Sequence, residues 1–477
     1  MTRLVWLRND LRLEDNPALA AAAASGEPLA ALYIATPATW QRHLLAPRKA
    51  DLLRRRLQAL RQELAAVGIP LYVRSCRWFS DTPAVIGPLM AELGATTLHM
   101  NREWLLDEQR RDSRVERQLQ AAGLRVYSHH DGLFLPPGSV CTASGEMFKV
   151  YTPFRRAVLR QLLSQGIPPL SATPKAQAMA VAGDDAAAID AAFAAVPQQP
   201  SAAFAASRSA LWQQLSAFLD GPLADYALNR DRPALNATSQ LSAAFSIGAI
   251  GMAETLNALL LRCPEVLESQ QGGAFSWLNE LIWREFYRHL CALQPSLVME
   301  KAFKPETEQL AWRQADDDFA AWCSGQTGFP IIDAAMQQLL ATGWMHNRLR
   351  MVVASFLSKH LLIDWRRGAH FFMQQLVDGD FAANNGGWQW AASTGCDAAP
   401  YFRIFNPITQ SQRFDADGAF IRHWLPQLNT LNDKQIHDPH GVVSAQAEQL
   451  GYPRPIVDLG QGRARALAAF SALSEVK

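Results

Sequence analysis

The first 130 residues alternate short apolar runs with amphipathic stretches, and this alternation limits the possible folds more than any other feature. Helical periodicity with glycine stops predicts helices between the apolar runs, at residues 17–24, 48–67, 83–93 and 107–122. The apolar runs predict strands buried on both faces, at residues 4–7, 29–35, 70–73, 97–100 and 124–127. A strand–helix series of this kind predicts an α/β fold with a doubly wound parallel sheet, whose ligand crevice lies at the carboxyl ends of the strands.

The turn after the first predicted strand reads RNDLR over residues 8–12. It lacks the glycines that let a backbone approach a pyrophosphate, so no dinucleotide is expected at this turn.

The remaining two thirds of the chain differ in composition and periodicity. Residues 171–210 contain 17 alanines and three prolines, which favours a long connection over packed structure. From residue 211 onward the periodicity is helical, with turns expected at the glycine pairs of residues 272–273, 325–328 and 386–387. We therefore predict an α/β domain over 1–132, a connection over 133–205 and an all-α domain over 206–477.

Charge and cysteine usage exclude several classes of protein. Lys and Arg number 45 against 44 Asp and Glu, so the net charge of +1 gives no global attraction for nucleic acid, and any polyanion must be held by a local patch. The six cysteines are widely spaced without a C-x-x-C pair, which predicts neither disulfides nor a metal site. No stretch of about 18 apolar residues occurs, so we expect a cytoplasmic, non-membrane protein.

Two segments predict helices with a candidate functional face. Over residues 343–362 (GWMHNRLRMVVASFLSKHLL) a core stripe runs through Leu349, Val352, Val353 and Phe356, and the opposite side carries Asn347, Arg350, Met351 and Ala354. A solvated surface face is the alternative reading. His346 is expected to be a hydrogen-bonded packing residue.

Over residues 276–290 (SWLNELIWREFYRHL), Trp277, Glu280 and Arg284 share one helix face, and Trp283 lies one turn before Tyr287. The alternative reading is a core helix with surface ion pairs.

Two further segments suggest ligand contacts. Residues 378–407 are rich in Gly, Asn and Asp, which favours a site-forming loop, with a polar turn before a helix as the alternative. Thr238 and Ser239 could cap a following helix whose N-terminus favours a diphosphate, although an ordinary cap needs no ligand.

The segments WLRNDLRLEDNPAL, WLNELIWREFYRHL, GWMHNRLRM and DGDFAANNGGWQWAASTGCDAAPYFRIFNP resemble the DNA photolyase and cryptochrome family, specifically its class I cyclobutane pyrimidine dimer photolyases. The resemblance covers nearly the whole chain, apart from the alanine-rich connection and about the last thirty residues. It implies an enzyme, a deoxyribodipyrimidine photolyase and carbon–carbon lyase, that repairs DNA with light. Photoexcited FADH⁻ would give one electron to a flipped-out dimer, the cyclobutane ring would open, and the electron would return.

The resemblance also implies roles for individual residues. Asn384 would face flavin N5, where a neutral amide helps to keep the reduced flavin anionic, and Arg350 would pair with Asp378 beside the ring. FAD would be held by Tyr226, Thr238, Ser239, Leu241, Ser242, Trp277, Glu280, Arg284, Trp344, Asn347, Arg350, Asp378, Asp380 and Asn384. The residues at the reacting groups would be Glu280, Asn384, Trp283 and Trp390.

For DNA, Trp283 and Trp390 would stack on the fused pyrimidines, Glu280 and Asn347 would bond base edges, and Met351 would pack on the ring. The phosphate contacts would come from Arg230, Arg232 and Arg403. An electron would reach oxidised flavin along Trp388, Trp365 and Trp312.

Three positions favour cyclobutane dimer repair over the other activities of the family. Asn347 and Met351 stand where six-four photolyases have histidines, and Asn384 stands where many signalling cryptochromes have an acid or cysteine. A blue-light-sensing cryptochrome and a single-strand-specific photolyase remain the alternatives. Gln240 replaces the usual Arg or Lys, which predicts weaker FAD binding.

A second, antenna pigment is expected, and its identity is the open point of the resemblance. Glu108 matches the pterin-binding acid, whereas Asp107 replaces the usual Asn and Met299 the usual Lys. Methenyltetrahydrofolate is the first expectation, with a deazaflavin, flavin mononucleotide or no pigment as alternatives. The protein is expected to act as a monomer on DNA containing dimers.

Overall fold

The computed structural model describes residues 2–176 and 183–475, which form two compact units. The first unit runs to Ala224 and adds Ser239–Pro295 and Val377–Gly379. The second unit contains Asp225–Thr238, Ser296–Leu376 and the chain from Asp380 onward. The three-part domain division expected from the sequence stays a prediction.

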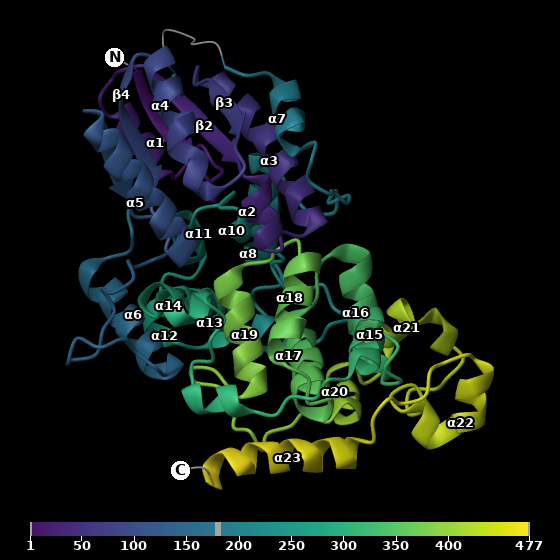
Figure 1. The fold of residues 1–477 in the computed structure, drawn as a ribbon. Helices are drawn as coiled ribbons and strands as arrows, with labels where there is room; N and C mark the ends of the chain where they lie inside the picture. The colour runs from purple at the N-terminus through teal and green to yellow at the C-terminus, as the bar shows by residue number, and fades with distance from the viewer. Residues whose placement is uncertain (1, 177–182, 476–477) are drawn as a thin grey trace. The chain divides into compact units, whose positions relative to one another are not determined.

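A five-stranded parallel sheet organises the first unit, and Figure 1 labels three of its strands, β2, β3 and β4. The strand order is β3-β2-β1-β4-β5. All five strands predicted from apolar runs are confirmed: β1 Thr2–Leu7, β2 Leu29–Ala35, β3 Leu71–Ser75, β4 Ala95–Asn101 and β5 Arg125–His129. Every residue of β2 is buried, as expected for a strand covered on both faces. The edge strand β5 has no buried residue, because it has a neighbouring strand on one side only, so the expectation of burial on both faces is wrong for this strand.

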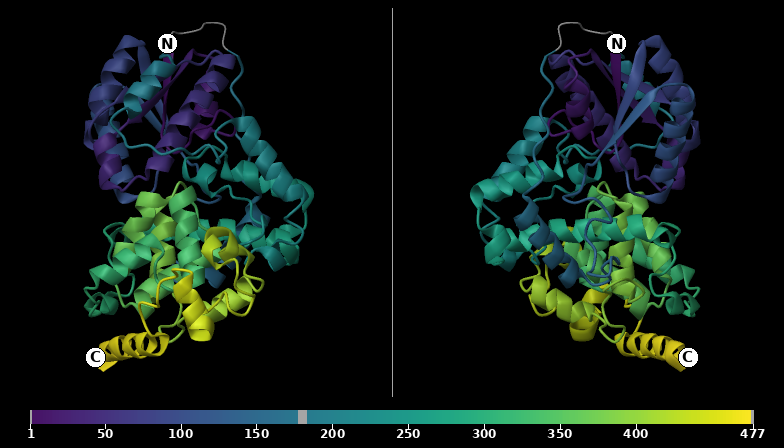
Figure 2. Two further views of the ribbon diagram at one scale, coloured as in Figure 1. Left: turned by 90° about the vertical axis from the view of Figure 1, so that its right-hand side faces the viewer. Right: turned by 90° about the vertical axis from the view of Figure 1, so that its left-hand side faces the viewer.

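The helices around this sheet also follow the predicted pattern (Figure 2). Gly68, Gly94 and Gly123 follow three of them with φ of 74°, 58° and 77°, a conformation that glycine adopts without strain. The predicted helices are α1 Pro17–Ala23, α3 Pro47–Ala66, α4 Thr82–Glu92 and α5 Leu106–Ala121, and the short α2 Pro37–Arg42 was not predicted.

The alanine-rich segment is more ordered than its composition suggested. Residues 177–182 lie outside the described residues, but α6 Tyr151–Gln165 precedes them and α7 Ala186–Phe193 follows. Ile189 and Phe193, one turn apart on α7, are 0% exposed and pack this helix against α3 and β3. Alanine has the highest helix propensity, so two apolar anchors suffice to dock the segment, and the expectation of an unpacked connection is wrong here.

The first unit is completed by helices that follow the sheet in sequence. They are α8 Arg208–Asp220, α10 Ser242–Ser246, α11 Met252–Arg262, α12 Val266–Ser269 and α13 Gly272–Leu293. Leu241 occupies the N-cap position of α10 without any side-chain cap, so the prediction that Thr238 and Ser239 cap this helix is wrong. Gly272–Gly273 open α13 instead of forming a separate turn.

The described part of the second unit contains helices and no strands, as predicted. Its core contains the stripe Leu349, Val352, Val353 and Phe356. Its helices are α9 Tyr226–Asn229, α15 Asp316–Ser324, α16 Pro330–Thr342, α17 Asn347–Ser355, α18 Trp365–Gln375, α19 Phe381–Ala392, α20 Pro407–Phe414, α21 Ala419–Trp424, α22 Pro439–Gln449 and α23 Leu459–Glu475, with α14 Pro295–Val298 at the unit boundary. A π-helical turn, Phe356–His360, directly follows α17.

Two helix predictions in this unit need correction. The helix expected over 343–362 starts only at Asn347, because Gly343 at φ 74° ends α16 and His346 caps α17. The loop expected over 378–407 is a helix, α19, for its first half, and Gly386–Gly387 lie inside it. Asp380 caps this helix by accepting from Ala383 N at 3.0 Å, and its buried face packs on α17 and α18. Tertiary packing therefore outweighs the low helix propensity of glycine and asparagine.

All six cysteines are free thiols, which agrees with the expected absence of disulfides. Among the described residues, no helix is both long and apolar enough to cross a membrane.

Candidate functional site

Helix α13 presents Trp283 on the surface of the first unit in a fixed orientation. The Trp283 ring lies parallel to Tyr151, with centroids 3.6 Å apart and planes at 6°. The Tyr151 hydroxyl donates to Asn279 O at 2.9 Å, one turn before Trp283 on the same helix. Tyr287 contacts the same indole with centroids 5.6 Å apart, as the helical spacing predicted. The tryptophan is thus held in place before any ligand binds.

The predicted functional face of α13 is present, with one unexpected contact. Trp277 is buried and packs on Phe218, with ring centroids 5.1 Å apart. Glu280 is half-buried one turn further along. The Arg284 guanidinium donates to Gly132 O at 2.7 Å, so this predicted FAD residue also fixes the chain that follows the sheet.

The opposite face of α13 carries a pair that the sequence analysis missed. Glu285, 0% exposed, accepts from Leu135 N at 2.9 Å, and His289 Nε2 donates to Leu135 O at 3.0 Å. These bonds join residues about 150 positions apart and fix the rotation of the helix about its axis. In the sequence, a Glu–His pair one turn apart on an otherwise apolar helix face could have indicated this buried contact.

The predicted FAD residues near α10 lie in both units. Within the first unit, Leu241 is buried and Ser242 exposed, while Ser239 O accepts from Gln214 Nε2 at 2.8 Å. Gln240 adopts a left-handed φ of 51°, unfavourable for a residue with a Cβ. Within the second unit, Thr238 is half-buried and the Arg230 guanidinium lies over the buried Tyr226 ring, 5.4 Å from its centroid.

Helix α17 carries the second set of predicted contacts. Burial lowers the pKa of His346 to about 4, so the ring is neutral at pH 7 and its Nδ1 accepts from Arg348 N at 3.2 Å. His346 is therefore the packing residue that the sequence predicted. Arg350 Nε donates to Met345 O at 2.8 Å. Asn347 is exposed and Met351 half-buried, one turn apart on one side of the helix.

Two more predicted residues lie close to this helix. Trp344 contacts His346 edge to face, with centroids 6.3 Å apart. Arg348 bonds Asp231 at 2.6 Å, which fastens the short segment carrying Arg230 and the exposed Arg232 to the start of α17.

Helix α19 orients Asn384 and Trp390. The Asn384 amide donates from Nδ2 to Ala369 O at 3.0 Å, which directs its carbonyl oxygen, Oδ1, away from that partner. Trp390 is half-buried and contacts Phe405, with ring centroids 6.4 Å apart. Arg403 is exposed on the loop that follows. Asp378 belongs to the first unit and Arg350 to the second, so their pairing stays a prediction.

The three predicted electron carriers all lie in the second unit. Trp388 and Trp365 are 2% and 1% exposed, and Trp312 is half-buried. Trp388 packs edge to face on Phe372 at 5.1 Å and on Trp322 at 5.9 Å between ring centroids. Trp322 is a further buried indole beside Trp388 that sequence reasoning did not single out. The order of transfer among the predicted three stays a prediction.

Gly368 lets Trp388 pack against α18. A Cβ at this position would stand 2.1 Å from Cη2 of Trp388 and 2.6 Å from Cδ2 of Leu357. We expect Gly368→Ala to destabilise the fold by about 1–3 kcal/mol through overpacking, although alanine favours a helix. Because the indole must move, photoreduction of oxidised flavin should slow at least severalfold in a flash-photolysis measurement.

Gly387→Ala is the matched control, because a Cβ there meets nothing within 4 Å. An unchanged melting temperature and photoreduction rate for Gly368→Ala would contradict the close packing described for Trp388.

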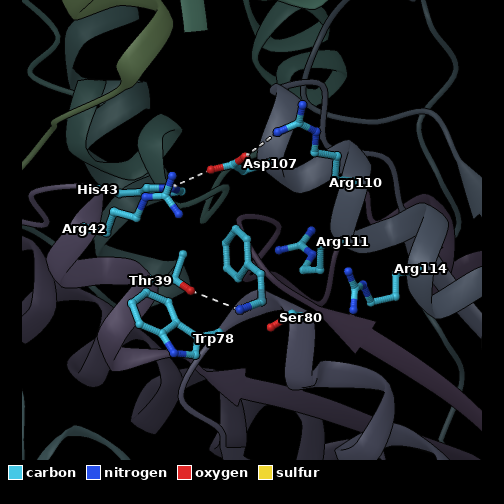
Figure 3. Close-up of a pocket in the computed structure, with 10 residues that line it drawn as sticks. Thr39, Arg42, His43, Trp78, Ser80, Asp107, Arg110, Arg111 and Arg114 are labelled. Atoms are coloured by element: carbon cyan, nitrogen blue, oxygen red, sulfur yellow. Dashed lines mark hydrogen bonds and ion pairs between the residues drawn. The ribbon is translucent and has the colours of Figure 1, made fainter. Parts of the chain in front are cut away.

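A cavity of about 230 Å³ in the first unit lies at the carboxyl ends of the strands, where the fold predicted a ligand crevice (Figure 3). Its aromatic walls are Trp78 and Phe79. The other lining residues are Thr39, Arg42, His43, Ser80, Asp107, Arg110, Arg111 and Arg114. Four arginines against one carboxylate favour an anionic, aromatic ligand.

Three polar residues of this cavity interact with one another. Asp107 accepts a hydrogen bond from His43 Nε2 at 3.2 Å and forms an ion pair with Arg110 at 3.6 Å (Figure 3). Burial, with a smaller effect of repulsion from Glu103, raises the pKa of Glu108 to about 7. Of the two predicted antenna residues, Asp107 lines this cavity, and Glu108, its neighbour in the chain, is not among the lining residues.

The residue types in both units fit FAD. Hydroxyl groups and arginines can bind its diphosphate, buried tryptophans can contact its rings, and the Asn384 carbonyl oxygen can accept a hydrogen bond from a ring N–H. Combinations of residues from different units stay predictions.

Comparison with known proteins supports this assignment. A family model described as DNA photolyase matches residues 3–175, and one described as the FAD binding domain of DNA photolyase matches residues 277–472. The deoxyribodipyrimidine photo-lyase of Salmonella typhimurium is 46% identical over 475 residues, which cover 99% of this chain and 98% of that protein. The enzyme of the same name from Escherichia coli is 45% identical over 481 residues and 100% of both chains.

A solved structure supports the same family assignment. The bacterial class III photolyase from Agrobacterium tumefaciens has a TM-score of 0.89 and 35% identity, with 99% of this chain and 98% of that chain covered. The chain belongs to the DNA photolyase family and contains that family's FAD-binding domain.

Proposed function

We propose that this chain uses light to split cyclobutane pyrimidine dimers in DNA. Reduced FAD, when bound and excited, supplies the electron that opens the cyclobutane ring. The observation that carries the proposal is the parallel stack of Trp283 on Tyr151 at 3.6 Å, which supports one face of the indole and fixes its plane. A rigid aromatic platform of this kind binds a base without ordering cost at the moment of contact.

The lesion is proposed to meet side chains from α13, α17 and α19. Trp283 and Trp390 stack on the fused pyrimidines, Glu280 and Asn347 hydrogen-bond their edges, and Met351 packs on the ring. Extruding bases from a duplex costs a few kcal/mol, and this cost is lowest for a damaged pair that already stacks badly. Selectivity for dimers therefore begins with the DNA itself.

Binding of the DNA backbone is proposed to rest on Arg230, Arg232 and Arg403. The net charge of +1 offers no long-range attraction, so affinity depends on a few local phosphate contacts. Asp231 lies between two of these arginines and is neutralised by Arg348 at 2.6 Å, which limits its repulsion of phosphate.

The FAD contacts are proposed for the residues that match the family motifs. Asn384 presents an amide oxygen, fixed because its Nδ2 donates to Ala369 O at 3.0 Å, and a neutral amide offers no acidic proton. The diphosphate region is assigned to Tyr226, Thr238, Ser239, Leu241 and Ser242. The remaining contacts are assigned to Trp277, Glu280, Arg284, Trp344, Asn347, Arg350, Asp378 and Asp380.

The test is illumination of the purified protein with dimer-containing DNA and a count of the remaining dimers. We expect light-dependent loss of dimers and no loss in the dark. A protein that binds FAD but removes no dimers would be a light receptor of this fold, and the proposal would fail. Repair of the same lesion in duplex and single-stranded DNA is compared in parallel, because activity on the single strand alone would indicate a single-strand-specific enzyme.

The antenna pigment is proposed to bind in the cavity between α2 and α5 of the first unit. Methenyltetrahydrofolate has an aromatic pterin for Trp78 and Phe79 and carboxylates for the arginines. Release of the pigment by denaturation, followed by mass spectrometry, identifies it. Recovery of a deazaflavin or of flavin mononucleotide would overturn the choice of folate.

Reversing the charge of two exposed arginines of this cavity should remove the pigment. We expect the double variant Arg42→Glu/Arg114→Glu to lose the antenna absorption, with affinity about tenfold or more weaker, because charge-assisted bonds contribute about 1.5–3 kcal/mol each. FAD content should not change. The double variant Arg117→Glu/Arg125→Glu, which reverses two exposed arginines outside the cavity, controls for the same change in net charge. Equal pigment in the two double variants would refute the location.

A cytoplasmic location and a monomeric state are also proposed. The six free thiols are typical of a reducing compartment.

A further inference from the structure

The loop after α19, residues 393–405 (the 393–405 loop), joins two of the predicted DNA contacts. Trp390 lies at the end of α19 and its carbonyl accepts from Ala399 N at 3.2 Å, so the loop folds back on the helix end. Phe405 contacts the Trp390 ring, and Arg403 is exposed between them. The backbone of this loop therefore sets the position of Arg403 relative to Trp390.

A buried lysine bonds the backbone of the 393–405 loop. Lys359 lies in the π-helical turn after α17 and is 0% exposed. Its Nζ donates to Arg403 O at 3.1 Å and to Pro400 O at 3.5 Å. The next residue, His360, donates from Nε2 to Phe405 O at 2.9 Å. Three carbonyls of one loop are thus bonded by two adjacent side chains.

The C-terminal helix α23 supports the same turn and the same loop. Arg465 donates to His360 O at 2.6 Å, and Phe470 stacks on Tyr401 with ring centroids 5.6 Å apart and planes at 12°. Lys304 adds a bond from Nζ to Ser393 O at 3.3 Å at the start of the loop. The loop is therefore contacted by the π-helical turn, by α23 and by Lys304.

We propose that Lys359 is a positioning residue for DNA binding: its ammonium group holds the 393–405 loop in the conformation that presents Arg403 to the phosphate backbone beside Trp390. The inference rests on the proposed function, because it needs a DNA ligand for Arg403. Lys359 itself is buried under the loop and touches no DNA.

The energetics support a functional rather than a stabilising role. Burial, with a smaller effect of the cationic Lys304, lowers the pKa of Lys359 to about 7. The unfolded chain therefore binds one more proton than the folded chain between pH 7 and the ordinary lysine pKa, so this group makes the fold more stable as pH rises through that range. At and below pH 7 the buried charge opposes folding. A charge kept at such a cost is expected to serve the site it supports.

The charged groups that act most strongly on the turn are basic, and the 393–405 loop itself carries one acidic residue, Asp397, besides Arg403. Lys304 acts on Lys359, and Arg463 and Arg465 of α23 act on His360. Helix α19 carries no ionisable side chain between its bounds. The ionisable side chains of α17 and α18 bond other partners; they are Arg348, Arg350, Arg366, Arg367 and His370.

The test is Lys359→Met, which keeps the length of the side chain and removes the charge. We expect the variant to bind dimer-containing DNA about tenfold more weakly at pH 6, in a fluorescence anisotropy titration, because the loop loses its charge-assisted bonds. At pH 6 its melting temperature should equal or exceed that of the wild type. The repair rate at saturating DNA should stay unchanged, since Lys359 does not touch the lesion.

The pH profile separates this role from simple packing. Wild-type affinity should fall as pH rises past about 7, where Lys359 loses its proton and the bonds to Pro400 O and Arg403 O become neutral ones. Lys359→Met should show a flatter profile, and Lys359→Arg should retain wild-type affinity to higher pH. Lys434→Met, which removes an exposed lysine of the same unit, controls for net charge and should leave both affinity and profile unchanged.

Two outcomes overturn the inference while leaving the proposed function intact. If the wild type repairs dimers and Lys359→Met binds DNA as tightly as the wild type at pH 6, Lys359 does not position the loop. If affinity and melting temperature fall together, the lysine is a structural residue. If the wild type itself repairs no dimers, the proposed function has failed instead.

Discussion

Replacing Trp388 by phenylalanine should abolish photoreduction of oxidised FAD and leave repair by pre-reduced enzyme intact. Trp388 is 2% exposed and packs on Phe372 and Trp322, so it lies in a dry region where an indole can give up an electron to one partner and recover it from another. A phenyl ring is far harder to oxidise. We therefore expect the photoreduction yield to fall more than tenfold, measured as the light-induced change in flavin absorption in the presence of an external reductant.

Repair by enzyme reduced chemically beforehand needs no electron from the surface, and its rate should match the wild type. The smaller ring leaves a cavity that costs roughly 1–3 kcal/mol of stability, so melting temperatures are measured alongside. Trp424→Phe, a half-buried tryptophan of the same unit, controls for the loss of an indole as such. Loss of repair together with photoreduction would show that Trp388 is not confined to photoreduction.

The second large effect is expected at Trp283. Trp283→Ala should weaken binding of dimer-containing DNA by about 1–3 kcal/mol, equivalent to roughly 5- to 150-fold, because one stacking platform is removed. FAD content should be unchanged. Trp212→Ala, a partly exposed tryptophan on α8 of the same unit, is the matched control.

Substitutions of Tyr151 separate the contribution of the Trp283 indole to DNA binding from the contribution of its fixed orientation. Tyr151→Ala should weaken binding less than Trp283→Ala, since the indole remains but loses the ring that fixes its plane at 3.6 Å. Tyr151→Phe keeps the stack and should bind nearly as the wild type. In a double-mutant cycle, the two alanine substitutions should be strongly non-additive; additive losses would indicate that the two aromatic side chains contact DNA independently.

The sequence by itself determined the parallel sheet of the first unit. The central strands β1, β2 and β4 are largely buried on both faces and the helices beside them have an apolar face, so hydrophobic periodicity reports these elements directly. It also identified the core stripe of α17, the packing role of His346 and the motifs of the site. These features depend on residues close together in the chain.

Tertiary structure alone decided the features that depend on distant residues. Glycine and asparagine in residues 381–392 favour a loop locally, yet packing against α17 and α18 makes this segment the helix that orients Asn384. Tyr151 meets Trp283 across about 130 positions, and Lys359 meets the carbonyls of Pro400 and Arg403 across about 40. The physical reason is that hydrophobic periodicity shows only which face of a helix or strand is buried. The residues that pack against this face are determined by long-range contacts, which form only in the folded chain.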